Sequence, residues 1–94
     1  MSHTSPEELE KKLKDACEKV EIGAIYSHYK TPEHTYVVEF VGLLEEKEEV
    51  CVGYRALYGN GLLWIRSLEN FTEKVDSENG ICSRFIQHSG KTLI

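Results

Sequence analysis

The chain has 94 residues, of which 40% are hydrophobic and 29% charged, a composition that predicts one small folded domain and leaves no room for a second. Its formal net charge of −5 at pH 7 disfavours unspecific binding to nucleic acid or anionic membranes, because both need an excess of positive charge. No apolar run approaches the roughly 20 residues that span a bilayer, and the N-terminus does not resemble a secretory signal. We therefore expect a soluble, cytoplasmic protein that does not bind membranes.

A helix is predicted over residues 6–20, within an N-terminal segment spanning residues 1–21. Ser5 can cap this helix, Pro6 suits its first position, and Glu8 can reach back to the cap amide. Apolar residues then recur on one helical face: Leu9, Leu13, Ala16, Cys17 and Val20. We expect this face to cover one end of a sheet, and a partner-binding or dimerising helix is the alternative.

From residue 22 the hydrophobic period changes to two, with Gly and polar breaks every eight to twelve residues, which is typical of a small antiparallel β domain. The domain is predicted to span 22–88, followed by a loose tail at 89–94. Strands are expected at 22–30, 35–44, 49–58, 62–67 and 82–87, with a short turn or strand at 69–75 and a proline-containing turn at 31–34. The predicted fold is mostly β (α+β): a strongly bent antiparallel sheet, or a Src-homology-3-like barrel, of about five strands with one N-terminal helix.

Two aromatic and basic runs, residues 54–59 and 63–66, flank the dipeptide Asn60-Gly61. Asn-Gly favours the positive φ angles of a two-residue hairpin turn, so the runs are expected to pair as neighbouring strands. With Leu63 and Ile65 in the core, Trp64 and Arg66 would share the other face.

Blocks of the chain read Tyr-Ser-His-Tyr-Lys from residue 26, Tyr-Arg-Ala-Leu-Tyr-Gly from residue 54 and Trp-Ile-Arg from residue 64. Over residues 23–85 they resemble a family of small, mainly bacterial domains of unknown function, whose blocks read Tyr-x-His-Tyr-Lys, His-Ser-Glu-Thr, Tyr-x-x-Leu-Tyr-Gly and Trp-Val-Arg-Pro. Two departures stand out: residues 44–47 read Leu-Glu-Glu-Lys in place of His-Ser-Glu-Thr, and Ser67 replaces the proline. The resemblance implies a family and no established activity.

Side chains that alternate along the predicted strands would gather on one aromatic and basic surface. The candidate ligand-binding residues are His28, Lys30, Arg55, Trp64 and Arg66. Arginine suits carboxylates and phosphates, and tryptophan offers a flat stacking face. We therefore expect a binding module for an unidentified small anionic ligand or peptide. Single-stranded nucleic acid is the second candidate, which the net charge opposes, and an enzyme is the third.

Each candidate also has a structural interpretation. Trp64 and Tyr54 could be packing residues, and His28 a partly exposed structural histidine. Arg55 and Arg66 could pair across strands with glutamates, for which Glu39, Glu46 and Glu49 are available.

Chemistry beyond binding has little support in the sequence. Cys17, Cys51 and Cys82 are widely spaced and odd in number, which predicts free thiols on buried or half-buried side chains rather than disulfides or a zinc site. The chain has no nucleophile motif and no Gly-rich phosphate loop. We assign no catalytic residue, metal or cofactor, and we favour a binding module over an enzyme.

Overall fold

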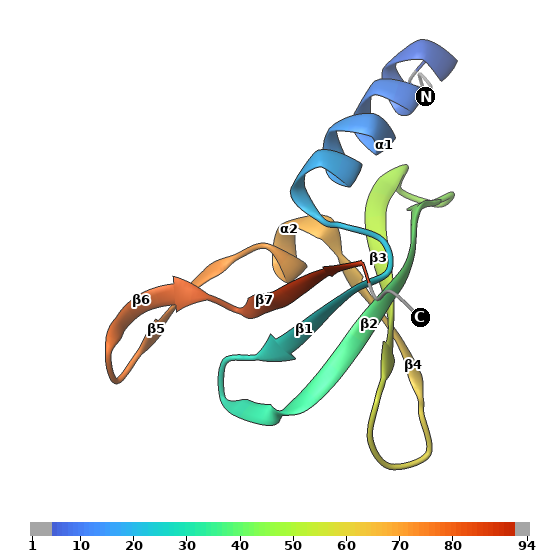
Figure 1. Cartoon of the computed structure of the whole chain (residues 1–94). Helices are drawn as coiled ribbons and strands as arrows, with labels where there is room; N and C mark the ends of the chain where they lie inside the picture. The colour runs from blue at the N-terminus through green and yellow to red at the C-terminus, as the bar shows by residue number, and fades with distance from the viewer. Residues whose placement is uncertain (1–4, 92–94) are drawn as a thin grey trace.

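The computed structural model describes residues 5–91. Their elements, in chain order, are α1 (Pro6–Lys19), β1 (Ala24–His28), β2 (Thr31–Leu44), β3 (Glu49–Ala56), β4 (Leu63–Ser67), α2 (Leu68–Phe71), β5 (Lys74–Ser77), β6 (Gly80–Ser83) and β7 (Phe85–Lys91) (Figure 1). Five strands form an antiparallel sheet in the order β4-β3-β2-β1-β7, and β5 and β6 form a separate hairpin. The mostly β fold with one N-terminal helix is confirmed. The sheet is not closed into a barrel, because β4 and β7 stay at its two edges.

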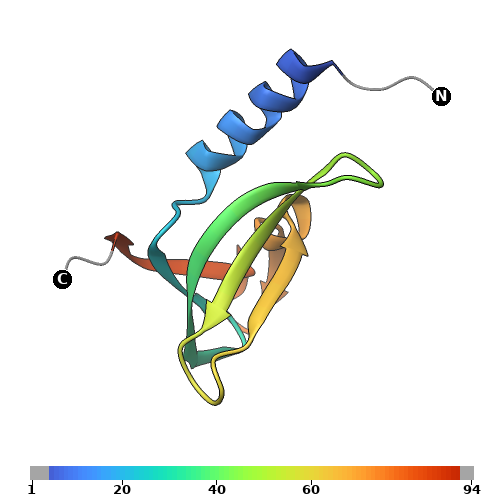
Figure 2. The same cartoon turned by 90° about the vertical axis from the view of Figure 1, so that its right-hand side faces the viewer.

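Helix α1 begins as predicted, and its fully buried residue lies near its C-terminal end. The Ser5 hydroxyl accepts a hydrogen bond of 3.2 Å from the Glu8 amide. Ala16 and Val20 are buried, whereas Cys17 is exposed, so the prediction of a covered thiol is wrong there and correct for the half-buried Cys51 and Cys82. The rest of the helix extends away from the sheet (Figure 2). No helix within residues 5–91 is long and apolar enough to cross a membrane.

The core is small and rich in aromatic rings. Its buried cluster consists of Val20, Ala24, Tyr26, Val38, Val52, Tyr54, Phe71 and Phe85. The rings of Phe71 and Phe85 are stacked with centroids 4.3 Å apart. Phe71 belongs to α2, so the segment predicted as a turn or strand at 69–75 instead supplies a helix that packs into the core.

The β3–β4 pairing is as predicted, but its turn is not. Six residues, 57–62, connect the strands, and the amide of Gly61 donates to the carbonyl of Tyr58 at 3.2 Å. Gly59 and Gly61 have φ angles of 59° and 66°. A two-residue turn centred on Asn60-Gly61 is therefore wrong, because the chain turns through Gly59-Asn60, with a glycine taking the first positive φ.

Several boundaries also differ from the prediction. Strand β2 begins at Thr31, so the chain reverses at residues 29–30 rather than 31–34. The strand predicted at 82–87 is split at Arg84 into β6 and β7. Strand β7 continues to Lys91, three residues into the predicted tail; residues 92–94 lie outside the described part of the chain.

A β-bulge interrupts the pairing of β2 with β3. Val38 pairs with Tyr54 and Phe40 with Gly53, which leaves Glu39 as the extra residue. The bulge places Glu39 beside Arg55, to which it is ion-paired, and the Phe40 ring over the α-carbon of Gly53.

Candidate functional site

An open hollow of about 220 Å³ lies on the core side of the sheet, lined by side chains of all five strands and of the β3–β4 turn. We call it the aromatic hollow. Its lining residues are His28, Tyr36, Tyr54, Tyr58, Trp64, Arg66 and Phe85. Five of the seven are aromatic residues without charge, and none is an aspartate or glutamate.

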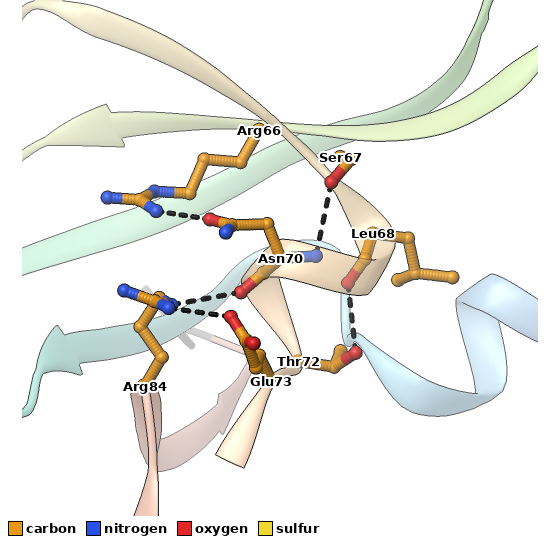
Figure 3. Close-up of polar contacts among 7 residues, drawn as sticks. All are labelled: Arg66, Ser67, Leu68, Asn70, Thr72, Glu73 and Arg84. Atoms are coloured by element: carbon orange, nitrogen blue, oxygen red, sulfur yellow. Dashed lines mark hydrogen bonds and ion pairs between the residues drawn. The ribbon is translucent and has the colours of Figure 1, made fainter. Parts of the chain in front are cut away.

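Arg66 is held in the hollow by neutral groups. Its Nε donates to the hydroxyl of Tyr54 at 2.8 Å, its Nη1 donates to the side-chain oxygen of Asn70, and its guanidinium lies 5.4 Å from the centre of the Phe85 ring. The second terminal nitrogen points away from Asn70 (Figure 3). Within residues 5–91, no carboxylate pairs with Arg66, so the structure leaves its charge without an ionic partner.

Helix α2 positions the asparagine that orients Arg66. The Ser67 hydroxyl caps this helix by accepting from the Asn70 amide at 3.1 Å. The Asn70 carbonyl in turn accepts from Nε of Arg84 at 3.2 Å, and Arg84 is ion-paired with Glu73 at 2.6 Å (Figure 3). Asn70 therefore binds Arg66 through its side chain and Arg84 through its backbone carbonyl. This link fixes the direction of the Arg66 guanidinium.

His28 contributes a neutral imidazole. Its Nδ1 accepts from the amide of Lys30 at 3.2 Å, which leaves the proton of the neutral ring on Nε2. Burial lowers the pKa of His28, and the positive charges of Arg66, Arg84 and Lys30 lower it further. At neutral pH the ring therefore carries one N–H donor, at Nε2, on a residue that lines the hollow.

The tyrosines supply further donors. The hydroxyls of Tyr36 and Tyr58 are 2.7 Å apart, and whichever donates, the other keeps its hydrogen for a third group. Tyr54 accepts from Arg66, so its own hydrogen is also available. Burial, followed by the bond to Tyr58, raises the pKa of Tyr36 to about 12, which keeps this phenol protonated. Residues that carry hydrogen-bond donors thus line a hollow around which residues 5–91 place no carboxylate.

The structure brings together three of the five predicted site residues: His28, Trp64 and Arg66. Arg55 lies on the opposite face of the sheet, where it donates to Glu39 at 2.7 and 3.2 Å and to the carbonyl of Gly61 at 2.9 Å. Its structural interpretation as an ion-pair partner of Glu39 is correct. Lys30 lines a separate hollow of about 780 Å³ beside the β5–β6 hairpin.

The packing interpretation holds for Tyr54, which is 4% exposed, but Trp64 is 49% exposed. Leu63 and Ile65 are also exposed, so the prediction that they lie in the core is wrong. They extend from the edge strand on the face opposite the aromatic hollow, where no buried layer covers them.

The predicted site residues omitted five residues of the site: Tyr36, Tyr54, Tyr58, Phe85 and Asn70. Tyr54 and Tyr58 lie in a family-like block, and their aromatic character was a usable signal. Asn70 gave none, because its role depends on a four-residue helix that is too short to show a hydrophobic period.

Other reactive groups in the described part of the chain do not form a second site. Ser27 Oγ lies 2.6 Å from Nε2 of His88, but Ser27 is only 2% exposed, so its hydroxyl is not accessible to a substrate. Within residues 5–91, no group of three or more His, Cys, Asp or Glu side chains is placed to hold a metal ion.

Comparison with known families matches residues 24–87 to DUF1653, a protein family of unknown function. The chain belongs to the DUF1653 family. It is also similar to the crystal structure of a DUF1653 protein from Bordetella bronchiseptica, with 29% identity and a TM-score of 0.65 over 81% of this chain and 96% of that chain. No curated protein matches. The expected membership of a small family of unknown function is confirmed, and α1 lies outside the part that matches DUF1653.

Proposed function

We propose that this DUF1653 domain is a binding module that holds an anionic group, a carboxylate or a phosphate, in the aromatic hollow. The observation that supports the proposal is the surplus of donors: Arg66, His28 and three tyrosines line one space, and no aspartate or glutamate is among its seven described lining residues. Hydrogen bonds to ionised acceptors are roughly twice as strong as neutral ones. An oxyanion would therefore satisfy several donors at once.

The residues around the hollow favour a small anion, or a single anionic group of a larger ligand, over a nucleic-acid strand. A protein that follows a single strand offers successive cations along a groove, whereas Arg66 is the one lysine or arginine among the described residues that line the hollow. Arg55 is ion-paired on the other face. Trp64, about half exposed, is available to stack on a planar part of the ligand.

NMR titration of the His28 ring with acetate and with inorganic phosphate tests this proposal at constant ionic strength. A bound anion stabilises the imidazolium, so we expect either anion to raise the pKa of His28. By linkage, anion affinity then rises as the pH falls through the range in which His28 takes up its proton. Arg66→Met should abolish the response.

Arg55→Met is the matched control, because it removes the same side chain from the opposite face and leaves the hollow intact. It should leave the His28 response unchanged. The proposal is wrong if neither anion moves the His28 pKa, or if Arg55→Met suppresses the response as strongly as Arg66→Met in a protein that remains folded.

A further inference from the structure

Strand β4 is an edge strand, and part of its backbone N–H and C=O groups point away from the sheet. The amide of Ala56 donates to the carbonyl of Leu62 at 2.9 Å, and the register continues as Tyr54 opposite Trp64. Residues that exchange hydrogen bonds alternate with those that do not in antiparallel pairs. Trp64 therefore directs its N–H and C=O toward β3, while Leu63 and Ile65 direct theirs away from the sheet.

The side chains of this edge are apolar and uncovered. The exposed fractions are 57% for Leu62, 40% for Leu63, 49% for Trp64 and 60% for Ile65. Natural edge strands are usually protected by lysine, proline, a bulge or a covering loop, and residues 62–65 contain neither lysine nor proline. An exposed apolar edge of this kind is suited to pairing with another strand.

We propose that β4 accepts an extended peptide segment of a partner protein, whose Asp or Glu side chain enters the aromatic hollow. The inference rests on the proposed anion site. Charge decides the occupant: β4 carries Arg66 and no acid, so pairing with β4 of a second copy would bring two such arginines to one interface without compensation. An acidic peptide supplies the missing charge.

The geometry of a sheet sets the pattern of such a peptide. A strand added to β4 lies about 4.8 Å away, and its side chains alternate between the two faces. Those beside Trp64 and Arg66 face the hollow, which suits an acidic residue. Those beside Leu63 and Ile65 face the opposite side, which suits β-branched apolar residues. The partner segment therefore alternates apolar and acidic residues, and its backbone bonds add affinity, as in other strand-addition complexes.

The test uses the peptide acetyl-Val-Glu-Val-Glu-Val-amide, followed by NMR and by amide hydrogen exchange of the domain. We expect saturable binding, protection of the Leu63 and Ile65 amides, and a raised His28 pKa. Replacing both Glu by Gln should weaken binding at least about tenfold, since a charge-assisted hydrogen bond contributes roughly 1.5–3 kcal/mol. N-methylation of the backbone amides that face β4 should weaken it by a similar factor.

A substitution in the domain makes the complementary test. Ile65→Pro removes an N–H that faces the open edge, and it leaves the hydrogen bonds between β4 and β3 intact. It should therefore abolish peptide binding. Ile65→Ala, which keeps the N–H, is its matched control and should retain measurable binding. Should Ile65→Pro fail to fold, the N-methylated peptides make the same test on the intact domain.

The outcomes separate this inference from the proposed function. If acetate raises the His28 pKa but the peptide leaves the Leu63 and Ile65 amides unprotected, the anion site stands and strand addition is overturned. If neither acetate nor the peptide affects His28, both are wrong. If sedimentation shows a dimer that Ile65→Pro disrupts while the peptide does not bind, the edge pairs with a second copy and the inference is overturned.

Discussion

Gly53 lies in contact with the Phe40 ring. This contact predicts whether Gly53→Ala raises or lowers the free energy of unfolding. Gly53 lies in β3 opposite Phe40, and a β-carbon added at Gly53 would lie 2.2, 2.2 and 2.7 Å from three atoms of the Phe40 ring. Gly53 is not among the residues with positive φ, so alanine suits its backbone. The clash with the ring is therefore the structural obstacle to Gly53→Ala.

The magnitude follows from how much of the ring is covered. Phe40 is 38% exposed, and full burial of a phenylalanine contributes roughly 1.5–3 kcal/mol, so expelling the ring costs about 1–2 kcal/mol. Replacing glycine by alanine within a strand recovers about 0.5–1 kcal/mol. We expect Gly53→Ala to destabilise the domain by about 1 kcal/mol, and to stabilise it by about 0.5 kcal/mol in a Phe40→Ala background, where the ring is absent.

Equilibrium urea unfolding of the four proteins in this double-mutant cycle measures the effect. The diagnostic result is the reversal of sign between the two backgrounds. If Gly53→Ala destabilised both backgrounds equally, the ring would not be the obstacle, and the reasoning from the bulged register would be refuted.

Three further perturbations probe the hollow and the helix. Because the pKa of His28 is lowered in the folded protein, the unfolded chain binds more protons than the folded protein as the pH falls below about 6.5. The urea midpoint should therefore fall more between pH 7.5 and pH 5.5 for the wild type than for His28→Gln. Tyr36→Phe should cost about 0.5–1.5 kcal/mol through the lost bond to Tyr58, and should remove from an ultraviolet titration the phenol that ionises near pH 12. Val20→Ala should lower the free energy of unfolding by about 2 kcal/mol, because Val20 is 1% exposed in the core. Leu9→Ala, at a half-buried position, should lower it by less than about 1 kcal/mol in the same assay. Equal losses would contradict this account of α1.

The sequence predicted elements whose signals are local. The cap at Ser5 and the proline that follows it mark the start of α1, and the alternation along residues 49–58 marks β3. Strand pairing across the Asn60 turn was also predictable, although the turn type was not, because glycines flank Asn60 on both sides and either Gly59-Asn60 or Asn60-Gly61 can form the turn.

The site was predictable only in part, because its geometry depends on contacts between distant segments. Trp64 and Arg66 share a face through simple alternation, and His28 joins them because β1 and β7 bring it beside Phe85. Arg55 was misplaced by treating all basic side chains of β3 and β4 as one surface. In register it stands opposite Leu63 and so faces away from the hollow.

The bulge at Glu39 divides β2 into two halves of opposite parity. Before it, even-numbered residues such as Tyr36 and Val38 face the core side, and after it Val41, opposite Val52, takes that position. Deleting Glu39 would therefore leave a regular ladder in which Val38, Phe40 and Val41 keep their present partners and faces. A one-residue deletion within either half of β2 would instead turn part of the strand to the opposite face. In alignments of DUF1653 sequences, a one-residue gap at Glu39 would thus mark a strand that lacks the bulge and keeps its core face.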